Sequence, residues 1–345
     1  MRDAGPTLRE LGEDALVSAV VSRFGPAPAW LQVPPGDDAA VIDLAAVRAG
    51  ASGSLVTATD SVVEGQDFRR DWSSGADVGV KVAAQNLADL AAMGAVPLAL
   101  LVSLAAPADL PAGWAVELAD GLAAECARAG AHVVGGDVSA AESVLVTGTG
   151  LGLLVGVPAV LRSGARAGDQ VAIAGTTGPS AAGLALLAAG WTDLAGLPGV
   201  LGLDPATSAA AGRMVAVHRR PAPPYPAGPA AAAAGAGAMI DTSDGLVRDA
   251  GRVARSSGVL LDLDPAALDL TADLGLVGAA LGVDPLGWAL GGGEDHALLA
   301  CYPPGVSLPD GFRPIGRVLG PAGGQPGVLV GGRPWTGDPG WLHFR

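Results

Sequence analysis

The class of fold is decided by residues 75–107, which read GADVGVKVAAQNLADLAAMGAVPLALLVSLAAP. The first part has the apolar spacing of a buried helix. Gly94 stands where that helix would end, because glycine enters the left-handed conformation of a helix C-terminus at little cost. The second part, residues 97–107, is an apolar run that predicts a buried strand. A helix that leads directly into a buried strand favours an α/β or α+β fold.

The rest of the chain repeats this mixture of patterns. Helices are expected over residues 8–25, 112–131, 178–190 and 244–258, with Ser243 or Asp244 as the cap of the last one, and strands over residues 53–63, 132–137, 143–156 and 259–264. Further strands are expected at the ends of residues 36–44, 161–175 and 289–303 and at the start of residues 238–258. The composition changes near Val157, so we predict two domains, residues 1–156 and 157–345. Residues 221–237 are rich in Pro, Ala and Gly and fit either a helix or a loop.

Composition limits the classes of function. The chain of 345 residues is 50% hydrophobic, enough to bury two cores. Its net charge of −14 opposes binding to nucleic acid or to an anionic membrane, and its uncharged runs contain Gly, Pro, Ser or Thr, unlike a membrane span. Lys81 is the only lysine, so a nucleotide site here has neither a Walker lysine nor the lysine of protein kinases.

Cysteine and histidine usage is sparse. Cys126 and Cys301 lie far apart without a CxxC neighbour, which favours buried free thiols in a reducing compartment. The first residues contain no apolar signal region, so a cytoplasmic location is expected. The four histidines, His132, His218, His296 and His343, lack metal-ligand spacing and are expected at the surface or in ordinary hydrogen bonds.

Aspartates recur beside strand ends and glycines. They stand in GDDAAV (Asp37, Asp38), TATDS (Asp60), VVGGDVS (Asp137) and MIDTSDGL (Asp241, Asp244), while Asp89 lies on a predicted helix face shared with Asn86 and Met93. Each has an ordinary structural alternative: a turn, a hairpin corner, a helix cap, or for Asp89 an ion pair with Lys81 or Arg128. Glu64 is expected to be solvated.

If these carboxylates converge, they raise one another's pKa unless a cation lies among them. Oxygen ligands without His or Cys are typical of Mg²⁺, which usually takes one or two carboxylates and phosphate oxygens. A surplus of aspartate therefore favours several Mg²⁺ ions holding a polyphosphate, and hence phosphoryl transfer. The chain has no GxxxxGK[ST], GxGxxG or GxSxG motif at a strand–helix junction, and its few aromatic residues disfavour a glycosidase.

Taken in order, these motifs resemble the thiamine-monophosphate kinase family of the aminoimidazole-ribonucleotide-synthetase superfamily. The resemblance is carried by GDDAAV, TATDSVVEGQDF, VAAQNLADLAAMGA, VVGGD, RSGARAGD, GPSAAGLALL, IDTSDGLVRD and GGGED, between residues 36 and 295. It implies ATP as co-substrate, thiamine monophosphate as acceptor, and a two-domain α/β (α+β) fold. In that fold the N-terminal sheet pairs with that of a second subunit in a homodimer, and helices cover the C-terminal sheet.

The resemblance also implies roles for single residues. The residues that look like Mg²⁺ ligands are Asp38, Thr59, Asp60, Asp89, Asp137, Asp241 and Asp244, and those that look like ATP contacts are Gly136, Asp137, Arg162 and Ser243. Substrate contacts would be Glu294 and Trp341, together with Asp67 at the position of a family histidine. Asp60, Asp137 and Arg162 would act in catalysis, and the N-terminal domain would bind metal and nucleotide while the C-terminal domain completes the ATP and substrate site.

Two departures leave alternatives open. Ala58 stands where the family has Ser or Thr, and Asp67 replaces a substrate-contacting histidine with a carboxylate that repels phosphate. The chain therefore fits an active kinase, another ATP-dependent enzyme of the superfamily, or a nucleotide- or thiamine-phosphate-binding homologue with impaired catalysis. A selenophosphate synthetase is disfavoured, because the first hundred residues contain no cysteine.

Overall fold

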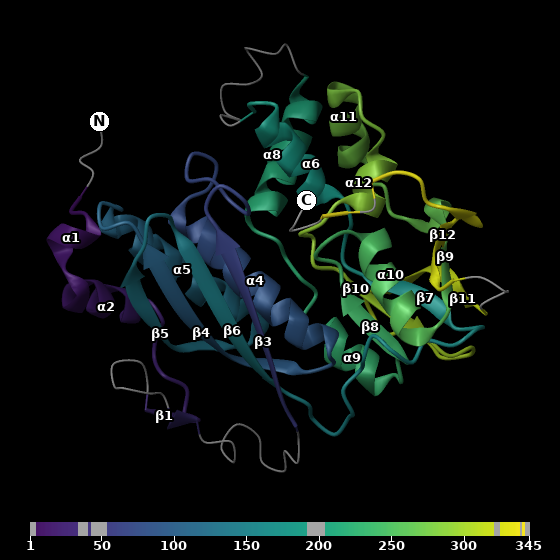
Figure 1. Ribbon diagram of the computed structural model, residues 1–345, viewed down its shortest axis with the longest axis horizontal. Helices are drawn as coiled ribbons and strands as arrows, with labels where there is room; N and C mark the ends of the chain where they lie inside the picture. The colour runs from purple at the N-terminus through teal and green to yellow at the C-terminus, as the bar shows by residue number, and fades with distance from the viewer. Residues whose placement is uncertain are drawn as a thin grey trace. The chain divides into compact units, whose positions relative to one another are not determined.

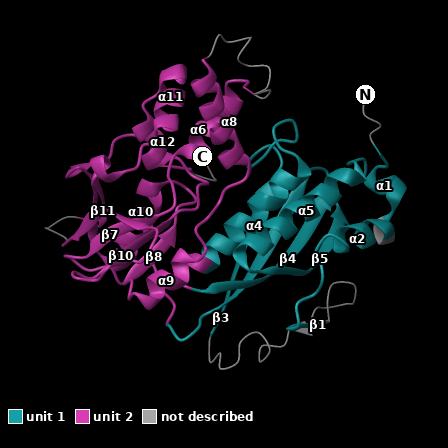
Figure 2. Cartoon of the chain, turned by 180° about the vertical axis from the view of Figure 1, so that it is seen from behind, with its two compact units in different colours: residues 1–90, 95–157 teal, residues 91–94, 158–345 magenta. Residues whose placement is uncertain are grey.

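The computed structural model describes residues 5–33, 41–42, 54–191, 204–320, 325–338 and 340–341. The chain forms two compact units, Met1–Leu90 with Ala95–Val157 and Ala91–Gly94 with Pro158–Arg345. Figure 2 shows the two units in different colours. Each contains its own sheet and helices, so the predicted mixed α/β fold is confirmed.

Unit 1 is built around a four-stranded sheet (Figure 1). Its elements are α1 (Leu8–Leu11), α2 (Glu13–Val21), β1 (Leu31–Val33), β2 (Val41–Ile42), β3 (Leu55–Val63), α4 (Gly75–Ala92), β4 (Val96–Ala106), α5 (Ala112–Ala129), β5 (His132–Ala140) and β6 (Leu145–Leu153). The strand order is β3-β6-β4-β5, in which β4 and β5 run parallel and the other pairs are antiparallel. The parallel pair is joined by the crossover helix α5, as a parallel connection requires.

Helices α4 and α5 lie across one face of this sheet (Figure 2). They meet through glycines: a Cβ on Gly79 would lie 2.1 Å from the Leu118 carbonyl oxygen, and one on Gly121 would lie 2.1 Å from that of Ala76. The helix-facing side of β6 is also made of glycine, since a Cβ on Gly150 would lie 3.0 Å from Leu90 Cδ1. These glycines let the helices approach each other and the sheet at backbone contact.

The structure corrects several local predictions in unit 1. The helix expected over residues 8–25 is two helices, because Gly12 adopts φ 81 between them. Asp60 and Asp137 were expected where strands end, but both lie inside strands, β3 and β5. Gly94 does follow α4 with φ 80, as predicted.

Unit 2 contains a seven-stranded sheet in the order β13-β12-β9-β11-β7-β10-β8. Its elements are β7 (Gln170–Ala174), α6 (Pro179–Ala188), α8 (Pro205–Arg219), α9 (Ala227–Ala233), β8 (Ala238–Asp241), α10 (Leu246–Ser257), β9 (Leu260–Leu263), the 3-10 turn η1 (Pro265–Ala267), α11 (Ala272–Leu281), α12 (Pro285–Gly291), β10 (Leu298–Tyr302), β11 (Phe312–Leu319), β12 (Gly327–Val330) and β13 (Arg333–Pro334). The neighbouring strands β7, β10 and β8 are almost wholly buried, although β8 is an edge strand of this sheet.

Two open points are settled in unit 2. The Pro/Ala/Gly-rich residues 221–237 contain a helix, α9. The predicted cap of α10 is wrong: Gly245 holds the cap position without a side-chain bond, and the carboxylate of Asp249 instead accepts the N–H groups of Asp244 and Gly245 at 3.0 and 3.1 Å. A carboxylate one turn into the helix thus satisfies donors that a preceding Ser or Asp was expected to satisfy.

Within the described part of the chain, no single helix is long and apolar enough to cross a bilayer. The consecutive helices α11 and α12 meet the length and composition test only as a pair bent by 113°.

The close approach of α4 and α5 makes a prediction about stability. Gly79→Ala should lower the free energy of unfolding by about 1–3 kcal/mol, because its methyl group overlaps the Leu118 carbonyl. Gly212→Ala is the matched control, since Gly212 lies within α8 and a Cβ there meets nothing within 4 Å. The control should gain up to about 1 kcal/mol from helix propensity. Urea denaturation of both variants measures the difference, and equal stabilities would contradict the packing described.

Candidate functional site

Asp60 is held by a buried asparagine on the neighbouring helix. The Asn86 side-chain oxygen accepts the Asp60 N–H at 3.0 Å, and the Asn86 amide nitrogen donates to the carbonyls of Asp60 at 3.4 Å and Val82 at 2.9 Å. Asn86 is fully buried, whereas the Asp60 side chain is exposed. A Cβ on Gly148 would lie 2.4 Å from the Asn86 amide nitrogen, so only glycine leaves room for this clasp. The carboxylate of Asp60 is therefore presented on a fixed backbone.

Asp89 lies one turn after Asn86 on α4, and it is partly buried. Helix α4 thus brings Asp89 to the helical face that holds Asp60. Asn86, which binds the Asp60 backbone, and Asp89 thus lie on one face of α4.

Asp137 is not close to Asp60. Ser61, Thr147, Ser103 and Asp137 form one row across the sheet, and Asp60 stands in the next row on the opposite edge strand. Three inter-strand spacings separate the edges by roughly 14 Å, so a single ion with Mg–O distances of about 2.1 Å cannot take both carboxylates of one chain.

No three His, Cys, Asp or Glu side chains lie close enough together to hold a metal ion among the residues that the structure describes. Asp38 lies outside the described residues. The described acids of unit 1 therefore form no closed protein cage of three or more carboxylates.

Thr59 and Gly136 have structural roles in the same sheet. The Thr59 hydroxyl donates to the Gly148 carbonyl at 2.8 Å and lies 3.0 Å from the Thr149 hydroxyl. A Cβ on Gly136 would lie 1.9 Å from the Val102 carbonyl oxygen, so β5 needs glycine there to pair with β4.

Hydrogen bonds that involve backbone groups hold the acidic loop after β3. The Val63 N–H donates to Asp67 Oδ2 at 2.8 Å, and Lys81 Nζ donates to the Asp67 carbonyl at 3.2 Å. Glu64 was expected to be solvated, and this is wrong: its carboxylate accepts Arg70 Nε at 2.5 Å and the Val144 N–H at 3.3 Å. Asp67 thus caps a turn, which accounts for a carboxylate at this position.

In unit 2, three segments that are distant in the sequence meet at the C-terminal end of β8. The Glu294 N–H donates to the Ser243 carbonyl at 2.8 Å, and the Trp341 N–H donates to the Asp244 carbonyl at 2.9 Å. The approach is close enough that a Cβ on Gly293 would lie 2.3 Å from the Ser243 carbonyl oxygen. The candidate ATP contact Ser243 and the candidate substrate contacts Glu294 and Trp341 are therefore brought together. We call these segments, residues 241–245, 291–296 and 340–341, the three-segment junction.

The acids of this junction have basic partners. Asp241, the last residue of β8, is buried with its Oδ2 3.1 Å from His296 Nδ1. Asp244 pairs with Arg252 and lies 3.4 Å from Arg248 Nε. The Asp244 carboxylate is thus neutralised by arginine, and it reaches a metal ion only by exchanging that partner.

Helix α6 begins against a buried carboxylate that the sequence reading missed. Asp295 accepts the N–H groups of Gly178 at 2.8 Å and Ser180 at 3.1 Å, the first donors of the helix. Burial raises the pKa of Asp295 to about 7, although the two N–H donors pull it down. The GGGED motif was quoted for Glu294, and only the fold shows that its neighbour caps a helix more than a hundred residues earlier.

Arg162 lies apart from the junction. It is exposed, and its carbonyl accepts the Ser257 hydroxyl at 3.1 Å at the far end of α10 from Ser243. A helix of 12 residues is about 18 Å long. The Arg162 backbone therefore lies at the C-terminal end of α10, whereas Ser243 lies just before the N-terminal end of this helix.

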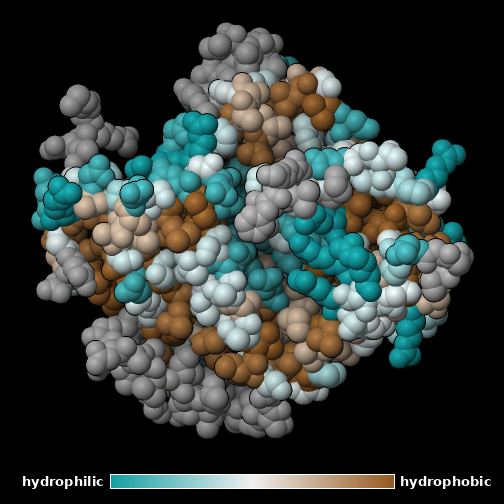
Figure 3. All heavy atoms as spheres, in the orientation of Figure 1, coloured by the Kyte–Doolittle hydropathy of each residue, from teal (hydrophilic) through white to brown (hydrophobic). Residues whose placement is uncertain are grey.

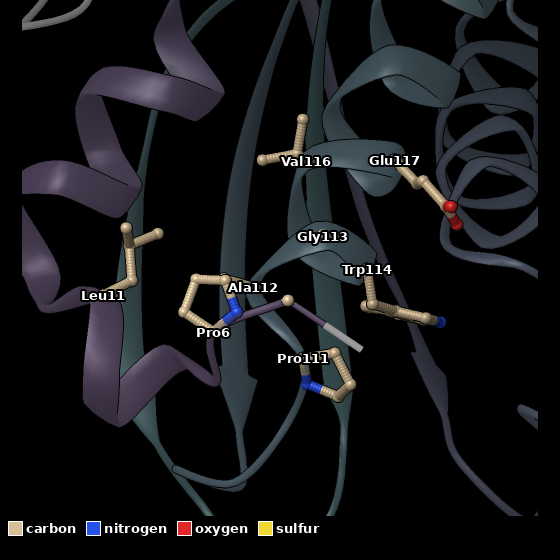
Figure 4. A pocket seen from close by; sticks show the side chains of 9 residues that line it. Pro6, Leu11, Pro111, Ala112, Gly113, Trp114, Val116 and Glu117 are labelled. Carbon is tan, nitrogen blue, oxygen red and sulfur yellow. The ribbon is translucent and has the colours of Figure 1, made fainter. Parts of the chain in front are cut away.

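A pocket in the described part of the chain lies elsewhere in unit 1 (Figure 4). It has a volume of about 530 Å³ and is lined by apolar residues between the N-terminal segment and the start of α5, among them Pro6, Leu11, Pro111 and Trp114. No candidate site residue lines it, and it contains a single acid, Glu117.

Comparison with known proteins agrees with the order of motifs. Residues 36–154 match the family described as AIR synthase related protein, N-terminal domain. The chain is 46% identical over 341 residues to a thiamine-monophosphate kinase of Mycobacterium tuberculosis, over 98% of this chain and 93% of that one. It is 36% identical over 319 residues to a thiamine-monophosphate kinase of Corynebacterium glutamicum, over 92% and 89% of the two chains.

Solved structures show the same relation. A thiamine-monophosphate kinase from Stenotrophomonas maltophilia superposes with a TM-score of 0.76 at 28% identity, over 92% of this chain and 96% of that chain. AaThiL complexed with AMPPCP and TMP superposes with a TM-score of 0.74 at 29% identity, over 98% and 99%. The hydrogenase maturation protein HypE in complex with ATP has a TM-score of 0.68 at 20% identity over 92% and 91%, which shows a shared fold alone.

The buried Asp295 predicts a pH dependence of stability. A carboxyl whose pKa is raised in the folded state contributes stability that is complete below its unfolded pKa, near 3.8, and is lost as the pH rises through about 7. The free energy of unfolding should therefore fall between pH 4 and pH 7 more steeply in the wild type than in Asp295→Asn, which has no proton to lose. Denaturation at several pH values measures both slopes, and parallel curves would contradict a raised pKa.

Proposed function

Because the chain belongs to the thiamine-monophosphate kinase family, we propose that it transfers the γ-phosphoryl group of ATP to the phosphate of thiamine monophosphate, giving thiamine diphosphate. The relatives are similar over nearly the whole chain, so the activity applies to the protein as a whole. The same relatives favour this reaction over those of other enzymes in the superfamily.

The three-segment junction is the observation that carries this proposal. It places Ser243 beside Glu294 and Trp341, so a candidate ATP contact and candidate substrate contacts share one backbone framework. The related AaThiL structure contains AMPPCP and TMP together, an ATP analogue and the acceptor. In this chain, Glu294 would accept a hydrogen bond from the aminopyrimidine, and Trp341 would offer an exposed ring beside it.

Nucleotide phosphates need cations to balance their charge. With a single lysine in the chain, Mg²⁺ is the fitting counterion, and the donor chemistry agrees, because Asp60, Asp89, Asp137 and Asp241 offer carboxylate oxygen. Bound Mg²⁺ would screen the repulsion between the two reacting phosphates. Separate acids suit ions that take one or two carboxylates each and complete their coordination with phosphate oxygen. Asp38, Thr59 and Asp244 remain candidate ligands of this set.

The protein's own share in the reaction is positioning. The acceptor phosphate is already anionic, so in-line transfer needs alignment and charge neutralisation and no strong base. Asn86 would hold Asp60 in place, Gly136 and Asp137 would stand beside the nucleotide, and Arg162 would supply a fixed cation for phosphate.

Asp67 does not favour an inactive homologue. Its carboxylate accepts the Val63 N–H and so stabilises its own loop. The proposed contribution of Asp67 to substrate binding is therefore to shape the loop after β3, in place of direct contact with a phosphate.

A homodimer is proposed from the uncovered face of the first sheet. Helices α4 and α5 cover one face, whereas Leu101, paired with Thr149 on the other face, is 38% exposed, and Leu55 on β3 is 53% exposed. Figure 3 shows hydrophobic residues gathered in the region where these strands lie. A second copy of the sheet would bury this surface.

We place the enzyme in the cytoplasm, where ATP is available and its two buried cysteines stay reduced.

Asp60→Asn tests the proposed metal site. The substitution removes the charge while the Asn86 clasp to the backbone remains, so kcat for thiamine diphosphate formation should fall on the order of 100-fold or more. Asp120→Asn is the control, because Asp120 is 48% exposed and only 3.6 Å from Arg23 in a surface ion pair. Product formation by chromatography measures both variants. Wild-type turnover in Asp60→Asn would show that Asp60 does not hold the metal.

Leu101→Asp tests the dimer. A carboxylate in the apolar interface should shift the protein from dimer to monomer at micromolar concentration, as measured by sedimentation velocity. Leu184→Asp, on α6 and 41% exposed, is the control and should leave the assembly unchanged. The dimer assignment fails if the wild type sediments as a monomer or if Leu101→Asp remains dimeric.

A further inference from the structure

His218, near the end of α8, lies buried beneath the proposed substrate contact. Its Nδ1 atom is 3.1 Å from the Ser180 hydroxyl and 3.4 Å from Glu294 Oε2, and its side chain is 6% exposed. The sequence predicted only an ordinary surface or hydrogen-bonded histidine. The structure connects this histidine to the single acid expected to recognise the substrate base.

The direction of this contact follows from the chemistry of its members. An ionised Glu294 carboxylate only accepts hydrogen bonds, so the Nδ1 atom facing it carries the proton. Neutral histidine protonated at Nδ1 and imidazolium both place this N–H between Ser180 Oγ and Glu294 Oε2. The ring thus presents a donor to the Glu294 carboxylate from the protein interior.

The support behind His218 is rigid. Ser180 belongs to the first turn of α6, and its N–H donates to the buried carboxylate of Asp295. A Cβ on Gly183, one turn further along α6, would lie 2.8 Å from His218 Cβ, so α6 and α8 are in close contact here. The position of the imidazole is therefore fixed by two packed helices.

Glu294 itself has a strained backbone. Its φ is 65, a region that residues other than glycine rarely occupy, and its N–H is bound to the Ser243 carbonyl. Such strain persists only where the surroundings impose it, and it is concentrated at functional sites. The Glu294 side chain is 32% exposed, so it contacts His218 in the interior and also reaches the surface.

From these contacts we propose that His218 is a positioning residue for substrate specificity. It holds one carboxylate oxygen of Glu294, so that the other faces the amino group of the pyrimidine ring of thiamine monophosphate. This inference rests on the proposed function, and it adds a residue that selects an amino-bearing base over one that lacks the donor. His218 acts through Glu294 and does not touch the reacting phosphates.

The test compares His218→Leu, which removes the donor, with His218→Asn, whose amide nitrogen replaces Nδ1. In His218→Leu the KM for thiamine monophosphate should rise about ten-fold, the loss expected for one hydrogen bond to a charged group, while the KM for ATP stays unchanged. His218→Asn should recover most of the loss. Oxythiamine monophosphate, whose ring bears a carbonyl oxygen in place of the amino group, should gain relative to thiamine monophosphate in the Leu variant.

The outcomes distinguish an error in the proposed function from an error in the role of His218. If Glu294→Gln leaves the binding of thiamine monophosphate unchanged, the base contact in the proposed function is wrong, and the inference falls with it. If Glu294→Gln weakens binding and His218→Leu does not, the positioning role alone is wrong. In His218→Leu, an equal rise in KM for thiamine monophosphate and for ATP would also overturn that role. So would an unchanged preference for thiamine monophosphate over oxythiamine monophosphate.

Ser180→Ala keeps the proposal testable if His218→Leu fails to fold. This substitution removes the hydroxyl that binds the imidazole of His218, while His218 itself is retained. A smaller rise in the KM for thiamine monophosphate, with the KM for ATP unchanged, is the expected result, and unchanged values for both substrates would overturn the proposal.

Discussion

Backbone-to-backbone contact at glycine is the constraint on which this structure depends. In unit 1, Gly79 lets α4 touch α5, and Gly136 lets β5 pair with β4. In unit 2, Gly293 and Gly340 let two segments reach the carbonyl oxygens of Ser243 and Asp244. At each of these positions a single methyl group would overlap a carbonyl oxygen, which a relaxed rotamer cannot relieve. The abundance of glycine in the sequence is thus partly a requirement of the site and not only of turns.

The acidic residues illustrate a second constraint, which is charge. A chain with 34 acids and 20 bases cannot pair every carboxylate with a cation, so backbone donors take a large share. Asp67 accepts the N–H of a turn, Asp295 accepts those of a helix, and Asp249 does the same at α10. Acids satisfied in this way are structural. Asp60 also accepts a backbone N–H, that of Ser61 at 2.8 Å, but it differs in two respects: Asn86 binds both its N–H and its carbonyl, and its side chain is exposed.

Sequence patterns predicted the elements well where local chemistry decides them. The end of α4 followed from Gly94, and β4 followed from an apolar run. Patterns failed where tertiary contacts decide: the break at Gly12, the cap of α10, and the position of Asp60 and Asp137 inside strands.

The candidate site divides in the same way. The family resemblance made Ser243, Glu294 and Trp341 candidates, and the fold brings their backbone segments together. The sequence was less informative about whether the aspartates share one cavity, because the identity of a residue does not say which edge of a sheet its strand will occupy. Asp60 and Asp137 occupy opposite edges. The roles of Asn86, His218 and Asp295 escaped sequence reading for a related reason: each is defined by a partner distant along the chain.

The three-segment junction suggests why this arrangement suits a two-substrate enzyme. A single strand end, β8, supplies Asp241 through its side chain, and the next residues supply carbonyl oxygens that fix the loop of Glu294 and the segment of Trp341. A shift of this strand end would therefore move the candidate metal ligand and the candidate base contact together. Since alignment is the main contribution of the protein to phosphoryl transfer, coupling the two through one backbone segment preserves their relative geometry as neither side chain could alone.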